Sequence, residues 1–420
     1  MSIDRRAFLK AGALSLFTLG AGPDFLRRAA LAAPPAGSAA APIATRRKTL
    51  VTIFLRGAMD GLMAVPPLND GLLRKHRQNL FLGAGDGLAT LGQGFGLHPA
   101  FAPLLPMWRE RQLAVVHSVG SPDPTRSHFD AQDYMETGTP GRKGTPSGWL
   151  NRASGLLGHE ATPFRSVALA SAMPRSLYGP EAALAITDLR ELQVRLPGSG
   201  TTATAAGEGF EALYDRSSQD LLRATAEDSF EAVREIATSG LASYRPASGV
   251  RYPRSPLGRS LMQIAAMIKA GVGLEIAFAE SGGWDTHVQQ GTINGSFARR
   301  ASDLANSIAA FWQDLGGLQD DVVVLTMTEF GRTVRQNGSG GTDHGHGSCL
   351  FALGHQVDGG KVHGDLPALE DRYLYEGRDL PVTTDFRSVF AGVAQAHLHL
   401  PSTGGLFPGW AGKSLELVRG

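Results

Sequence analysis

The sequence predicts an α/β fold built on a mostly parallel sheet that helices cover on both faces. Short apolar runs alternate along the chain with longer segments of helical periodicity, as expected for strands separated by crossover helices. The clearest of these helices are Arg259–Lys269 and Phe297–Leu315. The runs interpreted as buried strands are Lys48–Arg56, Gln112–Val119, Arg165–Ala170, Leu274–Ala279, Asp321–Thr326 and Cys349–Leu353.

The first residues carry the pattern of an export signal. Arg5 and Arg6 precede Phe-Leu-Lys, a short apolar run over Ala11–Gly22, and an A-x-A sequence ending at Ala32. These features are typical of a secretory signal of the twin-arginine type. We therefore expect residues 1–32 to direct the protein through the twin-arginine translocase to the periplasm or out of the cell. No stable membrane anchor is expected, because a span needs about 20 apolar residues.

The rest of the chain is predicted to form a linker and one domain. Residues 33–47 are rich in Ala and Pro, which is typical of a linker. Residues 48–420 predict a single α/β domain, because the strands in both halves look alike. Within it, residues 198–246 carry no strand signal and predict a helical insertion.

Composition limits the classes of partner and of metal site. Forty Lys and Arg against 39 Asp and Glu give a formal charge of +1, so nothing favours a nucleic-acid partner. The single cysteine, Cys349, excludes an internal disulfide and a cysteine metal site, so any metal must be held by His, Asp and Glu. The 53 glycines and 24 prolines cluster around short polar motifs, which indicates tight turns that shape a site.

Four polar clusters directly follow predicted strands, where open α/β sheets bind their ligands. In the first cluster, Asp60 either offers its carboxylate to a cation or bonds its own backbone in a turn. The second contains Arg126, Ser127 and His128. Ser127 matches a helix N-cap with Asp130 at the capping-box position. The same hydroxyl, at the positive end of a helix and beside an arginine able to grip an anion, also fits a nucleophile.

The third cluster is a glycine-rich loop that pairs Asp285 with His287. The two side chains are close enough in sequence to turn towards one point. Carboxylate with imidazole suits a divalent metal of the zinc or manganese kind.

The fourth cluster is double. Glu329 and Arg332 follow a very apolar strand, and Asp343, His344 and His346 come next among glycines. Histidines in such a loop can simply be solvated. Three ionisable groups within four residues are hard to explain by packing, however, so the pattern favours a metal site.

Taken together, these motifs resemble an exported bacterial family called domain of unknown function 1501. The resemblance extends from about Lys48 to Gly412. The family is grouped with the alkaline phosphatase and sulfatase superfamily, which implies a three-layer α/β/α sandwich. The strings that carry the resemblance are FLRGAMDG ending at Gly61, RSHF at Arg126 with Ala131-Gln132, GWDTH ending at His287, TEFGR ending at Arg332, and Asp343-His344.

The resemblance also implies a site for one or two divalent ions, whether zinc, manganese, magnesium or calcium. Asp60, Asp285, His287 and His344 would be ligands, with His346 as the alternative to His344, and Ser127 would be the nucleophile at a helix start. The superfamily's next carboxylate is normally an Asp followed directly by His. In this sequence Glu329 is followed by Phe330, which removes a ligand of the second ion.

These observations predict an exported, metal-dependent hydrolase of a small phosphate or sulfate ester. Arg126 and Arg332 would neutralise the anion, and Ser127 and His128 would act at the reacting group. The alternative is a non-catalytic exported protein that uses the same fold to bind surface polysaccharide or a secreted partner. The candidate metal ligands are Asp60, Asp285, His287, Glu329, Asp343, His344 and His346.

Overall fold

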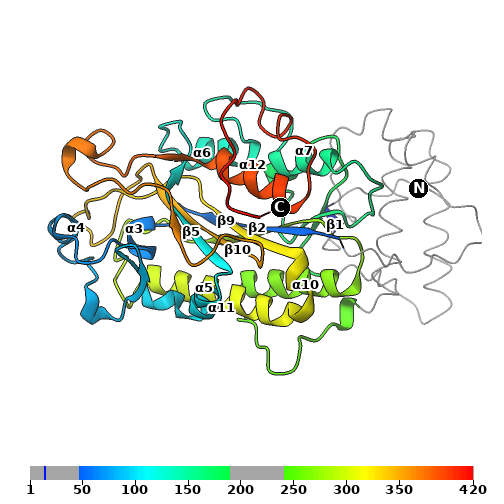
Figure 1. The fold of residues 1–420 in the computed structure, drawn as a ribbon, viewed down its shortest axis with the longest axis horizontal. Helices are drawn as coiled ribbons and strands as arrows, with labels where there is room; N and C mark the ends of the chain where they lie inside the picture. The colour runs from blue at the N-terminus through cyan, green and yellow to red at the C-terminus, as the bar shows by residue number, and fades with distance from the viewer. Residues whose placement is uncertain (1–13, 16–46, 190–240, 420) are drawn as a thin grey trace, which may run out of the picture.

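The computed structural model describes residues 14–15, 47–189 and 241–419. The expected signal (1–32) and linker (33–47) lie almost wholly outside the described residues, as does most of the expected helical insertion (198–246). The described part is an α/β fold with a ten-stranded sheet and helices on both faces (Figure 1). A separate two-stranded sheet pairs β3 (Ala89–Gly92) with β4 (Phe95–Leu97).

All six predicted strands are present in the large sheet. The strand order is β1-β7-β6-β8-β2-β9-β10-β5-β11, and β12 also pairs with β5. In that order the strands are β1 (Leu14–Ser15), β7 (Leu184–Ile186), β6 (Ser166–Ala168), β8 (Ile276–Gly282), β2 (Thr49–Arg56), β9 (Val322–Met327), β10 (Ser348–Leu353), β5 (Leu113–Gly120), β11 (Val362–His363) and β12 (Thr384–Asp385).

The sheet is mixed, so the prediction of a mostly parallel sheet is wrong. The five strands from β7 to β9 run parallel to one another. In contrast, β10 is antiparallel to both β9 and β5, and β1 is antiparallel to β7. A parallel connection needs a crossover that returns the chain to the opposite edge of the sheet. Residues 328–347, all of them described, contain no helix and connect β9 to β10 at one edge, so β10 runs back.

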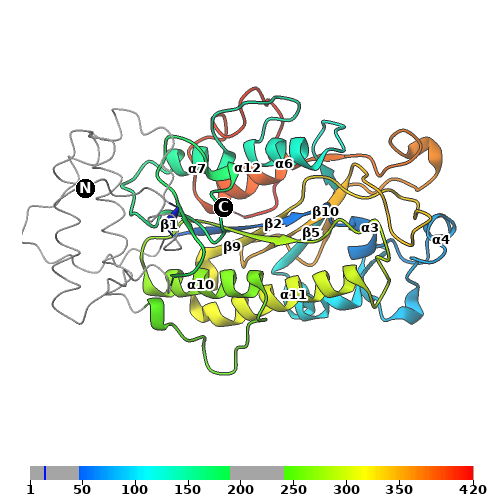
Figure 2. The ribbon, with the colours of Figure 1, turned by 180° about the vertical axis from the view of Figure 1, so that it is seen from behind.

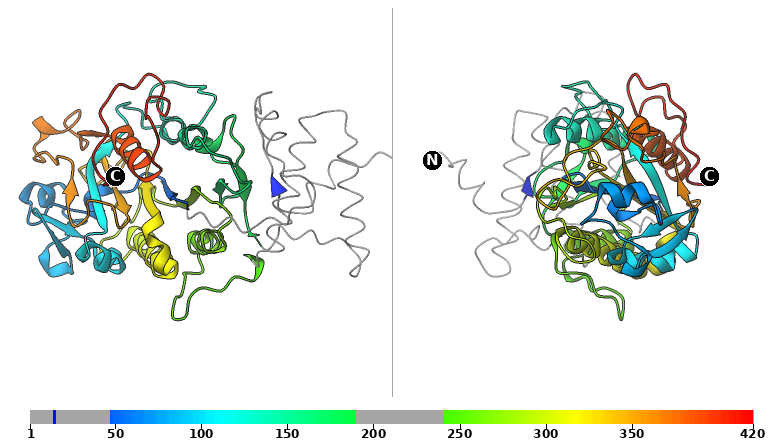
Figure 3. Two further views of the ribbon diagram at one scale, coloured as in Figure 1. Left: turned by 45° about the vertical axis from the view of Figure 1, so that its right-hand side comes forward. Right: turned by 90° about the vertical axis from the view of Figure 1, so that its left-hand side faces the viewer.

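The helices form a layer on each side of the sheet (Figure 2), and Figure 3 shows α12 and the pair α10 and α11 on opposite sides of it. One face carries α5 (Leu105–Arg109), α10 (Pro256–Ala270) and α11 (Ser296–Leu315). The other carries α6 (His128–Thr137), α7 (Trp149–Leu156) and α12 (Phe386–His397). No helix in the described ranges is both long and apolar enough to span a membrane. The remaining helical elements are short: α3 (Gly61–Ala64), α4 (Gly71–His76), η1 (Ala84–Asp86), η2 (Pro99–Leu104), η3 (Arg175–Leu177), η5 (Leu241–Ser243), η6 (Gly316–Asp321) and η7 (Asp371–Tyr373).

The central strand β2 explains why the sheet is covered twice. Val51, Ile53 and Leu55 pack into the core on the side of α10 and α11, whereas Leu50 and Phe54 pack on the side of α7 and α12. Successive side chains of a strand point to opposite faces, so an unbroken apolar run must be buried from both sides.

Local sequence signals set the bounds of the helix that leads into the site. The hydroxyl of Ser127 accepts a hydrogen bond from the backbone N–H of Asp130, and α6 begins at the next residue, His128. The helix ends at Gly138, whose φ of 66° is the left-handed conformation that favours glycine. The predicted N-cap is therefore confirmed, and it directs His128 into the first turn of α6.

The buried carboxylate of Asp314, in α11, binds the segment that comes after residue 240. Asp314 is 1% exposed and accepts hydrogen bonds from the Tyr244 and Tyr252 hydroxyls (2.7 and 2.8 Å), the Ala247 N–H (2.8 Å) and Lys269 Nζ (2.6 Å). Burial alone would raise the pKa of Asp314, but these hydrogen bonds, with Lys269 foremost, hold it below its ordinary value.

We expect Asp314→Ala to lower the free energy of unfolding at pH 7 by about 3 kcal/mol, because Lys269 and two tyrosines lose their shared acceptor. The pKa of Asp314 is lowered on folding. Its stabilisation is therefore present above the unfolded value of about 3.9 and is lost as the pH falls through the folded value. Urea denaturation should show that the stability difference between the wild type and the variant is smaller at acid pH than at pH 7. Asp303 is partly exposed on the same helix, so Asp303→Ala should lower the free energy of unfolding by less than about 0.5 kcal/mol. Equal effects of the two substitutions would contradict this role.

Candidate functional site

The predicted polar clusters meet at one edge of the sheet. β2, β8 and β9 are parallel neighbours, so their carboxyl ends lie together. Residues 121–128 leave the end of β5 at this edge, and residues 328–347 lead into the start of β10 there. Side chains from distant parts of the sequence are thus brought together where open α/β sheets place their ligand sites.

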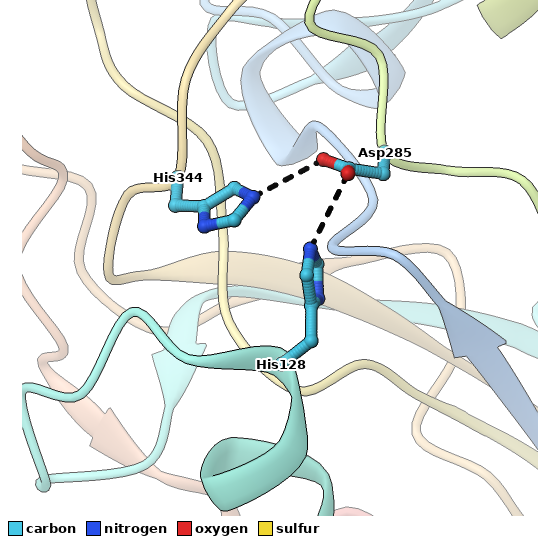
Figure 4. A group of neighbouring side chains, drawn as sticks. All are labelled: His128, Asp285 and His344. Carbon is cyan, nitrogen blue, oxygen red and sulfur yellow. Dashed lines mark hydrogen bonds and ion pairs between the residues drawn. The ribbon is translucent and has the colours of Figure 1, made fainter.

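Four side chains converge at this edge and form what we call the His/Asp cluster: His128, Asp285, His287 and His344. His128, Asp285 and His344 each place a ligand atom within 4.8 Å of the other two and could hold a metal ion (Figure 4). His287 Nε2 lies 2.9 Å from His344 Nε2 and 3.1 Å from Asp285 Oδ1. His344 Nε2 is 3.2 Å from Asp285 Oδ1, and His128 Nε2 is 3.5 Å from Asp285 Oδ2.

The outer nitrogen of each imidazole in the His/Asp cluster faces an oxygen that only accepts hydrogen bonds. His128 Nδ1 lies 2.8 Å from Glu329 Oε1, and His287 Nδ1 lies 3.0 Å from Asp343 Oδ1. His344 Nδ1 lies 2.8 Å from the backbone oxygen of Arg126. Each Nδ1 must therefore carry a proton, so each ring, when neutral, presents the lone pair of Nε2 to the centre of the cluster.

With all three rings neutral, three imidazole lone pairs and a carboxylate point at one another. Lone pairs separated by 2.9 Å repel unless a proton or a cation lies between them. In the described part of the chain, the buried Nε2 of His128 has no closer polar partner than Asp285 Oδ2 at 3.5 Å. Histidines whose outer nitrogen bonds a carboxylate or a backbone carbonyl are the usual ligands of bound metals. The donor set therefore fits a divalent cation.

Protonation differs between the rings of this cluster. The hydrogen bond to Glu329 raises the pKa of His128, although partial burial opposes it. Burial lowers the pKa of His344, which favours the neutral ring that a metal requires. Burial would raise the pKa of Asp285, but the hydrogen bond and charge of Arg332 hold it below its ordinary value.

Glu329 positions His128 and is itself fully buried. Its Oε1 accepts hydrogen bonds from the Gly57 N–H (2.8 Å) and Gln132 Nε2 (2.9 Å) as well as from His128. Gly57 has φ of 111°, and a Cβ there would lie 2.5 Å from the backbone nitrogen of Asp285. The glycine after β2 therefore allows two site loops to approach, a role that the sequence analysis did not assign.

Gln132 and Asn337 are positioning residues that the sequence analysis also missed. Gln132 follows His128 by four residues, so both lie on one face of α6, and this spacing could have identified it. Asn337 Nδ2 donates to Asp343 Oδ1 at 3.0 Å, and this bond, ahead of the contact with His287, lowers the pKa of Asp343. Asp343 therefore lies behind His287 and orients its ring.

Arg332 anchors the carboxylate at the centre of the site. Its guanidinium is buried and donates from Nη1 to Asp285 Oδ1 at 2.6 Å and from Nε to the Thr342 hydroxyl at 3.2 Å. A further bond joins Nη2 to the Thr342 carbonyl. With all three nitrogens engaged, Arg332 holds Asp285 in place.

Phe330 lies beneath two of the rings. Its ring centre is 4.9 Å from that of His128 and 5.0 Å from that of His344. The side chain is buried with Ala58 and Ala131. The residue that follows Glu329 therefore supports the imidazoles by packing and offers no ligand atom.

The structure places Asp60 in an ion pair instead of the cluster. Asp60 is 1% exposed, and its two oxygens accept from Arg77 Nη1 (2.8 Å) and Nη2 (3.0 Å). Gln290 Nε2 and the Met63 N–H also donate to it, at 2.7 and 3.1 Å. Of the two roles left open by the sequence, the structure shows the backbone cap, strengthened by a buried arginine.

Three other predicted residues lie near the cluster with different partners. His346 is buried, and its Nε2 bonds the Ser121 carbonyl at 2.9 Å, outside the cluster. Arg126 donates to Asp379 (2.6 and 3.1 Å) and Glu376 (2.7 Å). Ser127 is exposed and caps α6.

Sequence comparison connects the chain with a family. The model of the family described as "Protein of unknown function (DUF1501)" matches residues 84–405. This match covers most of the chain and confirms the expected family. No curated protein matches the chain.

We expect Asp60→Ala to lower the free energy of unfolding by about 3–5 kcal/mol, because Arg77 is left buried without its partner. Asp70 provides a matched control, since it caps α4 through the N–H three residues later, in the way that Asp60 caps α3, and it is partly exposed. Asp70→Ala should cost only about 1 kcal/mol. Chemical denaturation of both variants measures the difference. If Asp60→Ala were as stable as Asp70→Ala, the ion pair would not be a main support of this loop.

Proposed function

This chain belongs to the DUF1501 family of proteins of unknown function, and we propose that it is an exported, metal-dependent hydrolase of a phosphate or sulfate ester. The observation that carries the proposal is the convergence of three imidazole Nε2 atoms on the Asp285 carboxylate. Neighbouring acceptor atoms in this group lie only 2.9–3.5 Å apart, and the Nδ1 partners of the rings fix the tautomer that leaves Nε2 free to bind a cation.

In this proposal His128, Asp285, His287 and His344 hold the ion, which would be zinc, manganese, magnesium or calcium. Three imidazoles with one carboxylate favour the zinc and manganese end of this range. A bound divalent cation supplies a Lewis acid for an ester oxygen and lowers the pKa of a water molecule.

The chain's own residues orient the ligands and leave the centre accessible. Glu329 and Asp343 hold protons on the Nδ1 atoms of His128 and His287, and Arg332 holds Asp285. The side chains of Asp285 and His287 are 40% and 39% exposed, so a small anion can reach them from solvent. Ser127 is an exposed residue at the start of α6 beside His128, and in this proposal its hydroxyl contacts the ester.

A non-catalytic binding protein on the same fold is the second candidate. It is favoured by the state of the two predicted anion-binding arginines, because Arg126 already pairs with Glu376 and Asp379 and Arg332 with Asp285. Charge stabilisation of a reacting anion would then depend on the cation alone. Turnover measurements separate the two candidates.

Protein purified without chelator should contain about one equivalent of a divalent metal, measured by elemental analysis. The double variant Asp285→Asn/His344→Gln should retain less than about one tenth of it, because two ligands lose charge or basicity while Arg332 keeps an oxygen acceptor. His346→Gln is the matched control. It changes a histidine in the same loop that bonds Ser121, and it should keep the wild-type metal content.

The same proteins are then tested on aryl phosphate and aryl sulfate esters. The hydrolase proposal predicts turnover by the wild type and a loss of about 100-fold or more in the double variant. Metal without turnover would move the assignment to the binding protein. Folded wild type that contains no metal would overturn both the metal site and the hydrolase.

Export is tested through the arginine pair. Arg5→Lys/Arg6→Lys keeps the charge of the signal but removes the guanidinium pair typical of the twin-arginine route. We expect the variant to accumulate in the cytoplasm, whereas the wild type is found in the periplasm or the medium, as immunoblots of cell fractions would show. Lys10→Arg, a conservative change just after the pair, should be exported normally. Equal export of all three proteins would contradict the twin-arginine assignment.

A further inference from the structure

Two exposed apolar side chains directly follow histidines of the His/Asp cluster. Phe129 follows His128 and is 91% exposed, more than any other large apolar residue in the part of the chain that the structure describes. Val288 follows His287 and is 61% exposed. Adjacent Cα atoms are about 3.8 Å apart, so each side chain begins next to the backbone of a candidate ligand residue.

Neither side chain contributes much to the stability of the fold. Burial of a Phe or Val side chain contributes roughly 1.5–3 kcal/mol, and at these exposures most of that contribution is absent. Single exposed apolar residues are common on protein surfaces. Here, however, the two come from separate segments, the first turn of α6 and the loop after β8, that the cluster brings to one place.

Solvent reaches the cluster next to one of these residues, Val288. His287, which precedes Val288, is 39% exposed, whereas the ring of His128 is 24% exposed and packs against Phe330 and His344. A ligand whose anionic end reached Asp285 and His287 from solvent would place its other end near Val288 and Phe129. An organic group there would cover the exposed apolar surface.

We propose that Phe129 and Val288 form an apolar rim that binds the organic group of the ligand, so that the site takes anionic esters of aryl or bulky alkyl alcohols. The proposal rests on the proposed function for the anionic end of the ligand. A small ligand fits the rim better than a protein does. One aromatic side chain buries about 150–250 Å², and a specific protein interface needs about 800 Å² on each side.

The test measures binding of two non-hydrolysable anions, phenylphosphonate and methylphosphonate, to the full chain by calorimetry. The wild type should bind phenylphosphonate about tenfold more tightly. Phe129→Ser/Val288→Ser should reduce this preference to less than about twofold and leave the affinity for methylphosphonate unchanged. Tyr373→Ser is the matched control, because Tyr373 is 48% exposed in η7 and follows no histidine of the cluster. It should keep the tenfold preference.

Each result has a defined meaning. Equal affinities for the two anions in the wild type, or no binding of phenylphosphonate, would overturn the rim. A preference for phenylphosphonate that persists in the double variant would also overturn the rim. If the wild type were then a dimer and the double variant a monomer, the two residues would be assigned to a protein contact. Aryl preference in binding without turnover of any ester would contradict only the hydrolase and would support the rim. Folding of the double variant, checked by circular dichroism, should be unchanged because both side chains are exposed.

Discussion

The buried carboxylate of Glu329 joins the parts of the site that lie farthest apart in the sequence. It follows β9, receives the Gly57 N–H after β2, and accepts hydrogen bonds from His128 and Gln132 on α6. Burial alone would raise the pKa of Glu329, but these hydrogen bonds keep it below its ordinary value, so the group remains an acceptor. That charge fixes the proton on His128 Nδ1 and turns Nε2 towards Asp285. The placement of His128 in the His/Asp cluster therefore depends on one ionised, hydrogen-bonded group.

Much of this arrangement could be predicted from the sequence, because it follows from local pattern and one rule of topology. Apolar runs such as Thr49–Arg56 are buried on both faces, and this burial is visible in the sequence as an absence of polar alternation. Polar residues after such runs must then meet at one sheet edge. This reasoning identifies Asp285, His287 and His344 as candidate ligands and Ser127 as the N-cap of α6, whereas it predicts that His128 acts at the reacting group and not as a ligand.

What the sequence could not predict depends on partners far along the chain. Asp60 has the local pattern of a ligand, but Arg77 occupies both of its oxygens. His344 and His346 are equivalent in sequence, and only the position of the Arg126 and Ser121 carbonyls decides which ring enters the cluster. The direction of β10 likewise depends on the absence of a crossover helix after β9, a tertiary property that strand patterns do not contain.

The charges around the cluster explain why a cation would complete it. Asp285, Glu329 and Asp343 place three carboxylates around the cluster, and the guanidinium of Arg332 pairs with one of them, Asp285, while the Nδ1 contacts are compatible with three neutral imidazoles. Two negative charges are therefore left without a compensating charge among these groups when the rings are neutral, and one of them is carried by the fully buried Glu329. A proton on His128, whose pKa the hydrogen bond to Glu329 raises, would supply part of this charge, whereas burial lowers the pKa of His344 and opposes a proton there. A divalent cation supplies the same charge and also accepts the Nε2 lone pairs, so one ion resolves both the electrostatic and the hydrogen-bonding imbalance.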